Sequence, residues 1–127
     1  MDRQPETLNL PDSPFRLGEW LVDPTLSRLS RGTTTVHVEI KVMDVLVCLA
    51  THATRLVTRQ ELRDAVWATD FVAENTLTRV IAELRSALGD DAKSPAYIET
   101  IHRRGYHLLV APTDPEPWRD LSFRNRD

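Results

Sequence analysis

The chain has 127 residues, which suits one domain with one hydrophobic core. Hydrophobic residues make up 41% and charged residues 28%, as in globular proteins, and no apolar run approaches the roughly 20 residues that a membrane-spanning helix needs. The single cysteine, Cys48, excludes an internal disulfide and a cysteine-based zinc site. Its place in an apolar helical run favours packing over a nucleophilic role.

The formal net charge of −3 bears on the partners that the chain can have. Acidic residues outnumber basic ones in residues 1–14, 57–74 and 111–127, whereas residues 15–56 and 75–110 are slightly basic. A phosphate responds to the local field within about 8–10 Å rather than to the total charge. The total therefore weakens the case for nucleic-acid binding, but it leaves residues 75–110 available for that role.

The N-terminal part of the chain predicts a flexible leader followed by a small antiparallel sheet. Several prolines among polar residues favour a leader over residues 1–14. Short alternating runs follow, separated by turn signals that include glycine and an Asp-Pro pair. The strands are expected at residues 15–17, 20–22, 26–29 and 34–38.

Three helices are predicted after the sheet. Residues 39–53 carry so wide an apolar face that this helix is expected at the centre of the fold. Thr58 and Glu61 have the spacing of a capping box, which predicts a second helix through residue 67. A third helix is expected over residues 75–88, because Gly89 is a typical C-terminal stop.

The third helix has an outer face suited to the major groove of DNA. Ala82 and Ser86 are small enough to enter a groove about 12 Å wide. Arg79 is suited to donate to guanine, and Glu83 to accept from cytosine. Arg85 lies nearer the core side, from which the DNA backbone is easier to reach than the bases. A plain amphipathic helix with a solvated outer face explains the pattern equally well. Further candidates at the helix start and edge are Asn75, Thr76 and Thr78.

Residues 97–102 and 106–110 predict two strands of a β-hairpin around Arg103-Arg104-Gly105. Two adjacent arginines at a tight turn repel each other, and a polyanion at the tip would relieve that repulsion. A solvated turn is the alternative interpretation. The residues expected to meet DNA on this hairpin are Thr100, His102, Arg103 and Arg104.

No group of residues supports catalysis or metal binding. The four histidines show no metal-ligand spacing with Cys48 or with carboxylates. No Ser/His/Asp grouping, phosphate-cradling glycine loop or carboxylate pair stands out. We therefore expect a protein that is not an enzyme and that uses no metal or cofactor.

Four stretches, in this order, resemble one family of DNA-binding domains. They are KVMDVL (41–46), VTRQELRDAVW (57–67), NTLTRVIAELRSALGDD (75–91) and PAYIETIHRRGY (95–106). Together they make residues 15–110 resemble the OmpR/PhoB-type winged-helix domain of bacterial transcription regulators, especially its CadC/ToxR-like branch. The resemblance implies an α+β, winged helix-turn-helix fold with an N-terminal antiparallel β-sheet, a three-helix core and a C-terminal β-hairpin wing.

The resemblance also implies sequence-specific binding of double-stranded DNA. The third helix would enter the major groove, and the wing, residues 97–110, would meet the backbone or the minor groove. Arg59 and Trp67 match positions that touch phosphates in the family, although a surface salt bridge is the alternative for Arg59. Where relatives often carry basic residues, this chain has Ala82 and Glu83. Glu83 and the net charge of −3 favour an alternative function, a winged helix used for protein–protein contact, beside the leading hypothesis of DNA binding.

The family also implies an architecture and partners. Response regulators of the family carry a receiver domain before the winged helix, whereas only 14 residues stand before it in this sequence. The module is therefore expected to head its chain, with residues 111–127 as a Pro-rich tail or linker. It would act in the cytoplasm, either alone or as part of a membrane-anchored regulator. With no heptad run, we expect a monomer that binds direct repeats.

RNA polymerase is a further expected partner, through the loop at residues 68–74. This loop can touch the polymerase in the family. We expect Asp70, Phe71 and Val72 to do so here, with Phe71 as the anchor. The alternative is that Phe71 packs onto the core.

Overall fold

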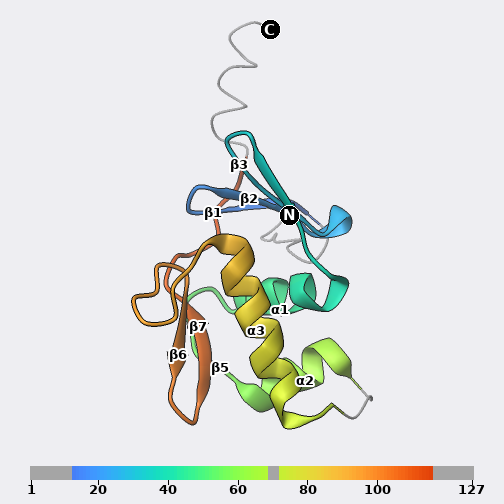
Figure 1. Cartoon of the computed structure of the whole chain (residues 1–127), viewed down its shortest axis with the longest axis vertical. Coiled ribbons are helices and arrows are strands. Elements are labelled where there is room, and N and C mark those ends of the chain that lie inside the picture. Colours follow the sequence, from blue (N-terminus) through green and yellow to red (C-terminus); the bar gives the residue numbers. More distant parts are fainter. Residues whose placement is uncertain (1–12, 69–71, 116–127) are drawn as a thin grey trace, which may run out of the picture.

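The computed structural model describes residues 13–68 and 72–115 of the chain (Figure 1). No helix in these ranges is long and apolar enough to cross a membrane. The elements in chain order are β1 (Phe15–Leu17), β2 (Trp20–Asp23), the 3-10 turn η1 (Pro24–Leu26), β3 (Arg28–Arg31), β4 (Thr34–His37), α1 (Ile40–Thr51), β5 (Val57–Thr58), α2 (Arg59–Trp67), α3 (Glu74–Leu88), β6 (Ile98–Ile101) and β7 (Gly105–Leu108).

The N-terminal sheet has four antiparallel strands in the order β1-β2-β3-β4. Phe15, Leu17, Trp20 and Val22 are buried at alternate positions, as expected for a sheet with one face on the core. The indole Nε1 of Trp20 donates to the carbonyl of Leu88 at 3.3 Å. The sheet is thereby joined to the C-terminal end of α3.

The third strand begins later than the sequence predicts. Residues 26–29 were expected as a strand, but Pro24 opens a 3-10 turn that ends at Ser27, whose φ of 48° is left-handed. The amide of Ser27 donates to the carbonyl of Pro24 at 3.2 Å. The strand starts only at Arg28, because proline fixes a φ suited to such a turn.

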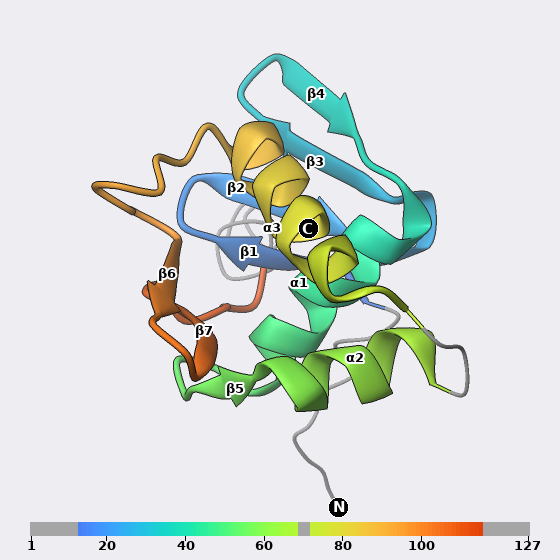
Figure 2. The same cartoon turned by 60° about the horizontal axis from the view of Figure 1, so that its bottom comes forward.

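Helix α1 is the centre of the fold, as its wide apolar face predicted. Figure 1 shows it between the N-terminal sheet and α2, and Figure 2 shows α3 crossing it on another side. The ammonium of Lys41 on α1 donates to the carbonyl of Val66 at 2.8 Å, which ties α1 to the end of α2. The buried residues of α1 are Val42, Met43, Val45, Leu46, Leu49 and Ala50.

Helix α2 begins with the predicted capping box. The amide of Glu61 donates to Thr58 Oγ1 at 3.0 Å, and the amide of Thr58 donates to Glu61 Oε1 at 2.8 Å. Each side chain satisfies an amide that the first helical turn leaves without a partner.

The two-residue strand β5, which was not predicted, attaches the wing to the start of α2. In the sheet order β5-β7-β6, Val57 pairs with Tyr106 and Thr58 pairs with Gly105. A Cβ on Gly105 would lie 2.1 Å from the carbonyl oxygen of Val57. Only glycine therefore permits this close approach.

The chain returns to the N-terminal sheet after the wing. The amide of Arg16 donates to the carbonyl of Thr113 at 2.8 Å, and the amide of Thr113 donates to that of Arg16 at 2.9 Å. Backbone pairing thus continues past residue 110, where the tail was expected to begin. Most of the expected leader and tail lies outside the described residues.

Candidate nucleic-acid interface

Helix α3 and the wing lie side by side and extend away from the N-terminal sheet (Figure 1). The core face of α3 is formed by Leu77, Val80, Ile81, Leu84 and Leu88. The outer face of α3 is the one that helical spacing predicted. Of the residues expected there, Thr76 is half-buried. The exposed residues of this face are Asn75, Thr78, Arg79, Ala82, Glu83 and Ser86.

The two predicted base readers of α3 contact each other. Arg79 Nη1 donates to Glu83 Oε2 at 2.9 Å, one helical turn along the outer face. Their side chains are 60% and 44% exposed, so the pair is open to a partner from outside.

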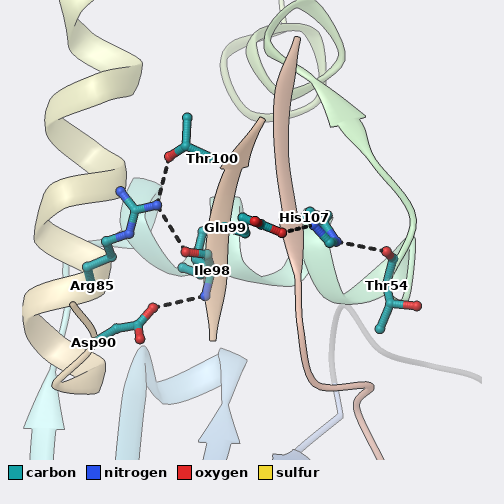
Figure 3. Close-up of polar contacts among 7 residues, drawn as sticks. All are labelled: Thr54, Arg85, Asp90, Ile98, Glu99, Thr100 and His107. Atoms are coloured by element: carbon teal, nitrogen blue, oxygen red, sulfur yellow. Dashed lines mark hydrogen bonds and ion pairs between the residues drawn. The ribbon is translucent and has the colours of Figure 1, made fainter. Parts of the chain in front are cut away.

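Arg85 points to the wing instead of the outer face. Its Nη2 donates to the carbonyl of Ile98 at 3.0 Å and to Thr100 Oγ1 at 2.8 Å (Figure 3). Its Nε is buried without a hydrogen-bond partner among the described residues. This contact with β6 is one that sequence reasoning missed, and a contact of Arg85 with the DNA backbone stays a prediction. Thr100 is exposed, as expected, and serves as an acceptor here.

Asp90 fixes the path of the chain from α3 into the wing. This role was not predicted from the sequence. Its Oδ1 accepts from the amides of Ala96 and Tyr97 at 2.7 and 3.2 Å, and its Oδ2 from that of Ile98 at 2.9 Å. Hydrogen bonds from several amides to one carboxylate are charge-assisted and strong. The only signal in the sequence is an aspartate directly after the glycine that ends α3.

The wing tip presents its basic residues to solvent. The amide of Arg104 donates to the carbonyl of Ile101 at 2.8 Å and closes the turn, with His102, Arg103 and Arg104 exposed. Neither arginine forms an ion pair with any residue in the described ranges. Arg103 also has a left-handed φ of 65°, which costs a residue with a Cβ about 1–2 kcal/mol. Both arginines are thus exposed and without an ion pair among the described residues, and their contact with DNA stays a prediction.

Arg59 joins three elements. Its Nη1 donates to the hydroxyl of Tyr106 on β7 at 2.9 Å, and its Nη2 donates to Thr78 Oγ1 on α3 at 3.3 Å. The guanidinium carbon also lies 5.9 Å from the centroid of the Tyr106 ring. Arg59 thus orients the wing against α3, and its predicted phosphate contact stays a prediction.

Two other expected contact sites are less accessible than the sequence suggested. Trp67 is only 8% exposed and belongs to the core, and its predicted phosphate contact stays a prediction. Val72 is half-buried and packs against the core, whereas Asp70 and Phe71 lie outside the described residues.

Two further titratable residues, His107 and Cys48, have structural contacts. His107 Nε2 lies 2.8 Å from Glu99 Oε1, and its Nδ1 lies 3.2 Å from the carbonyl oxygen of Thr54 (Figure 3). Burial, and then the negative charge of Glu61, raises the pKa of the half-buried Cys48 thiol, which packs against the core. Within the described ranges, no three His, Cys, Asp or Glu side chains form a group that could hold a metal ion.

Known proteins resemble this chain in sequence. The transcriptional activator CadC of Escherichia coli K12 is 42% identical over 96 residues, which cover 75% of this chain and 19% of CadC. The transcriptional regulator HilA of Salmonella typhi is 37% identical over 94 residues, which cover 70% of this chain and 17% of HilA. The chain thus matches about a fifth of the length of these relatives.

Solved structures resemble the fold. The DNA-binding domain of Escherichia coli CadC matches with a TM-score of 0.71 and 39% identity, covering 78% of this chain and 94% of that domain. The Klebsiella pneumoniae RstA DNA-binding domain, in complex with the RstA box, matches with a TM-score of 0.67 and 26% identity, covering 75% of this chain and 95% of that domain.

The family model described as "Transcriptional regulatory protein, C terminal" matches residues 32–108, which include α1, α2, α3 and the two wing strands β6 and β7. These comparisons confirm the predicted winged-helix fold and the predicted resemblance. The chain therefore belongs to the OmpR/PhoB-type family of transcriptional regulatory domains.

Proposed function

We propose that this chain is the sequence-specific, double-stranded DNA-binding domain of a bacterial transcription regulator. The observation that carries the proposal is the pair of exposed arginines without ion-pair partners in the described ranges, Arg103 and Arg104, on a wing beside the polar outer face of α3. The names of the relatives support it, because CadC and HilA are transcriptional regulators and the DNA-binding domain of RstA was solved in complex with the RstA box.

In this proposal α3 lies in the major groove and reads base edges. Ala82 and Ser86 allow the helix backbone to approach the groove floor, and Arg79 reaches guanine. Asn75 and Thr76 lie in the first turn of α3, which has no side-chain hydrogen bond at its N-cap, Ala73. The positive end of the helix dipole favours a phosphate there.

The wing supplies most of the attraction to phosphate. Arg103 and Arg104 meet the backbone or the minor groove, with His102 at the same tip. A net charge of −3 is compatible with this arrangement, because a phosphate at the wing tip responds to the basic groups within a Debye length of about 8–10 Å and not to the total charge. Arg59 and Thr100 support the wing and contact phosphate at its edges.

The alternative function, protein–protein contact, rests on the net charge and on Glu83. The structure weakens the second argument, because the charge of Glu83 is compensated by Arg79 at 2.9 Å. A single compensated carboxylate on a neutral polar face is compatible with DNA.

The proposal extends to assembly and location. The domain is a monomer that occupies direct repeats in tandem, and light scattering at micromolar concentration without DNA tests this. It acts in the cytoplasm, alone or within a membrane-anchored regulator. RNA polymerase is a proposed partner on the family resemblance.

Selection of bound sequences from a random pool of duplexes tests the proposed function. The chain is expected to enrich one short motif, and a tandem arrangement would repeat it in the same orientation, one helical turn of DNA apart. A pool that stays random after several rounds, while the protein binds another protein tightly, would support the alternative.

A further inference from the structure

The ion pair between Arg79 and Glu83 is not explained by helix stability. An exposed pair contributes little, and the order with arginine before glutamate is the less favourable one along a helix. Both side chains are nevertheless held at 2.9 Å on the face that α3 presents outward.

The pair makes the outer face of α3 nearly neutral. Among the exposed side chains that the structure describes on this helix, Arg79 is the only cation, and Glu83 offsets its charge. Arg85 is half-buried and engaged with β6. Attraction to any phosphate, whatever the sequence, must then come mainly from the wing, which leaves α3 free to discriminate between bases.

Arg79 keeps enough donors to read a base while Glu83 holds it. A guanidinium has five N–H donors, and the contact with Glu83 engages one nitrogen, Nη1. A bidentate contact with guanine O6 and N7 requires two donors on one edge. A guanidinium held by a carboxylate has already lost much of its rotamer freedom, so it loses less on binding a base.

We infer that Glu83 is a positioning residue that makes Arg79 selective for guanine, and that Glu83 does not itself read cytosine. This inference rests on the proposed function. Without Glu83, Arg79 would swing to the nearest phosphate, because that contact needs no particular base. The carboxylate repels phosphates at the same place, so Glu83 lowers binding to random DNA and raises the preference for one sequence.

The test is a double-mutant cycle on the motif selected by the wild-type chain. Binding of wild type, Arg79→Ala, Glu83→Gln and the double variant is measured on the motif, on random duplex, and on motifs with each guanine replaced in turn by 7-deazaguanine, which lacks the N7 acceptor. Glu19→Gln, which removes an exposed charge in the turn between β1 and β2, is the matched control.

Arg79→Ala is expected to lose about 5- to 150-fold in discrimination at one guanine. Glu83→Gln should weaken discrimination at that same guanine and bind random duplex about twofold or more tightly. In the Arg79→Ala background the Glu83 substitution should change discrimination little. The double-mutant cycle should therefore show that the effects of the two substitutions on discrimination depart from independence by at least about twofold. Glu19→Gln should leave discrimination unchanged.

Two results would overturn the inference while leaving the proposed function intact. One is a Glu83→Gln effect at a cytosine that persists in the Arg79→Ala background, which would make Glu83 a direct reader. The other is independent, additive effects of the two substitutions. If the wild-type chain selects no motif at all, the proposed function itself fails.

Discussion

Arg85 Nη2 lies 2.8 Å from Thr100 Oγ1, and this hydrogen bond ties α3 to the first strand of the wing (Figure 3). The same nitrogen donates to the carbonyl of Ile98, whose amide is held by Asp90. Arg85 in the last turn of α3 and Asp90 just after the helix thus hold the carbonyl and the amide of one residue of β6. A domain that places a helix and a wing on one duplex needs a fixed orientation of the wing relative to the helix.

We predict that Arg85→Met weakens binding to the selected motif about tenfold but leaves the salt dependence unchanged. The loss comes from a misplaced wing, because hydrogen bonds from a charged group contribute about 1.5–3 kcal/mol. Thr100→Val, which removes only the hydroxyl acceptor, should reproduce part of the effect. Titrations at several salt concentrations measure both quantities. A slope that falls by about 0.9 in Arg85→Met would instead identify a direct phosphate contact.

At the wing tip we predict that Arg103→Gly stabilises the fold while weakening DNA binding. Glycine adopts the left-handed φ of 65° without strain, so the free energy of unfolding should rise by up to about 1 kcal/mol. One lost phosphate contact should flatten the salt slope by about 0.9. Urea denaturation and salt titration of the same preparation measure the two effects. A variant that is more stable and binds with an unchanged slope would remove Arg103 from the interface.

Replacing both wing arginines by alanine should weaken binding to all duplexes about equally. The salt slope is then expected to flatten by roughly one to two units. Comparison of the selected motif with random duplex checks the uniformity. A loss confined to the selected motif would show that Arg103 and Arg104 read bases rather than phosphates.

We predict that Thr58→Ala lowers the free energy of unfolding by about 1 kcal/mol, because it removes the N-cap acceptor of α2. Thr25→Ala is a suitable control, since Thr25 is an exposed threonine whose hydroxyl donates to Asp23 and caps no α-helix. Urea denaturation at pH 7 compares the two variants. Equal stabilities would show that the capping box is energetically unimportant.

The capping box should also depend on pH through Glu61. The amide of Thr58 donates to its carboxylate and holds the pKa of Glu61 below its ordinary value. A lowered folded pKa stabilises the fold above the unfolded pKa of about 4.3, and this stabilisation disappears as the pH falls through the folded pKa. The stability difference between wild type and Glu61→Gln should therefore be present at pH 7 and shrink below about pH 4. A difference that grows on acidification would contradict this assignment.

Gly105→Ala should destabilise the domain by about 3 kcal/mol or more, because the new Cβ would lie 2.1 Å from the carbonyl of Val57. Gly32→Ala is the control. Its φ of 60° is also positive, but no atom lies within 4 Å of its Cβ position, so about 1–2 kcal/mol is expected. Thermal unfolding of both variants gives the comparison. Equal losses would show that strain, and not the contact with β5, is what matters.

Local patterns predicted the helices, the capping box and the exposed arginines of the wing, because each depends on residues close together in the chain. The third strand was placed early, since the alternation around Leu29 does not reveal the turn at Pro24. Strand β5 was not predicted, because it is only two residues long and its partner strand β7 is distant in sequence. A helical wheel shows that Arg85 lies nearer the core, but only the fold shows that β6 meets it there.

The salt dependence of binding to random-sequence duplex tests the central claim most directly. If the wing arginines meet phosphates, the wild-type chain should bind at low salt, and log K should fall linearly with log salt at a slope of about −2 or steeper. Wild-type chain that shows no binding at low salt, or an affinity that does not change with salt, would contradict DNA binding by this domain.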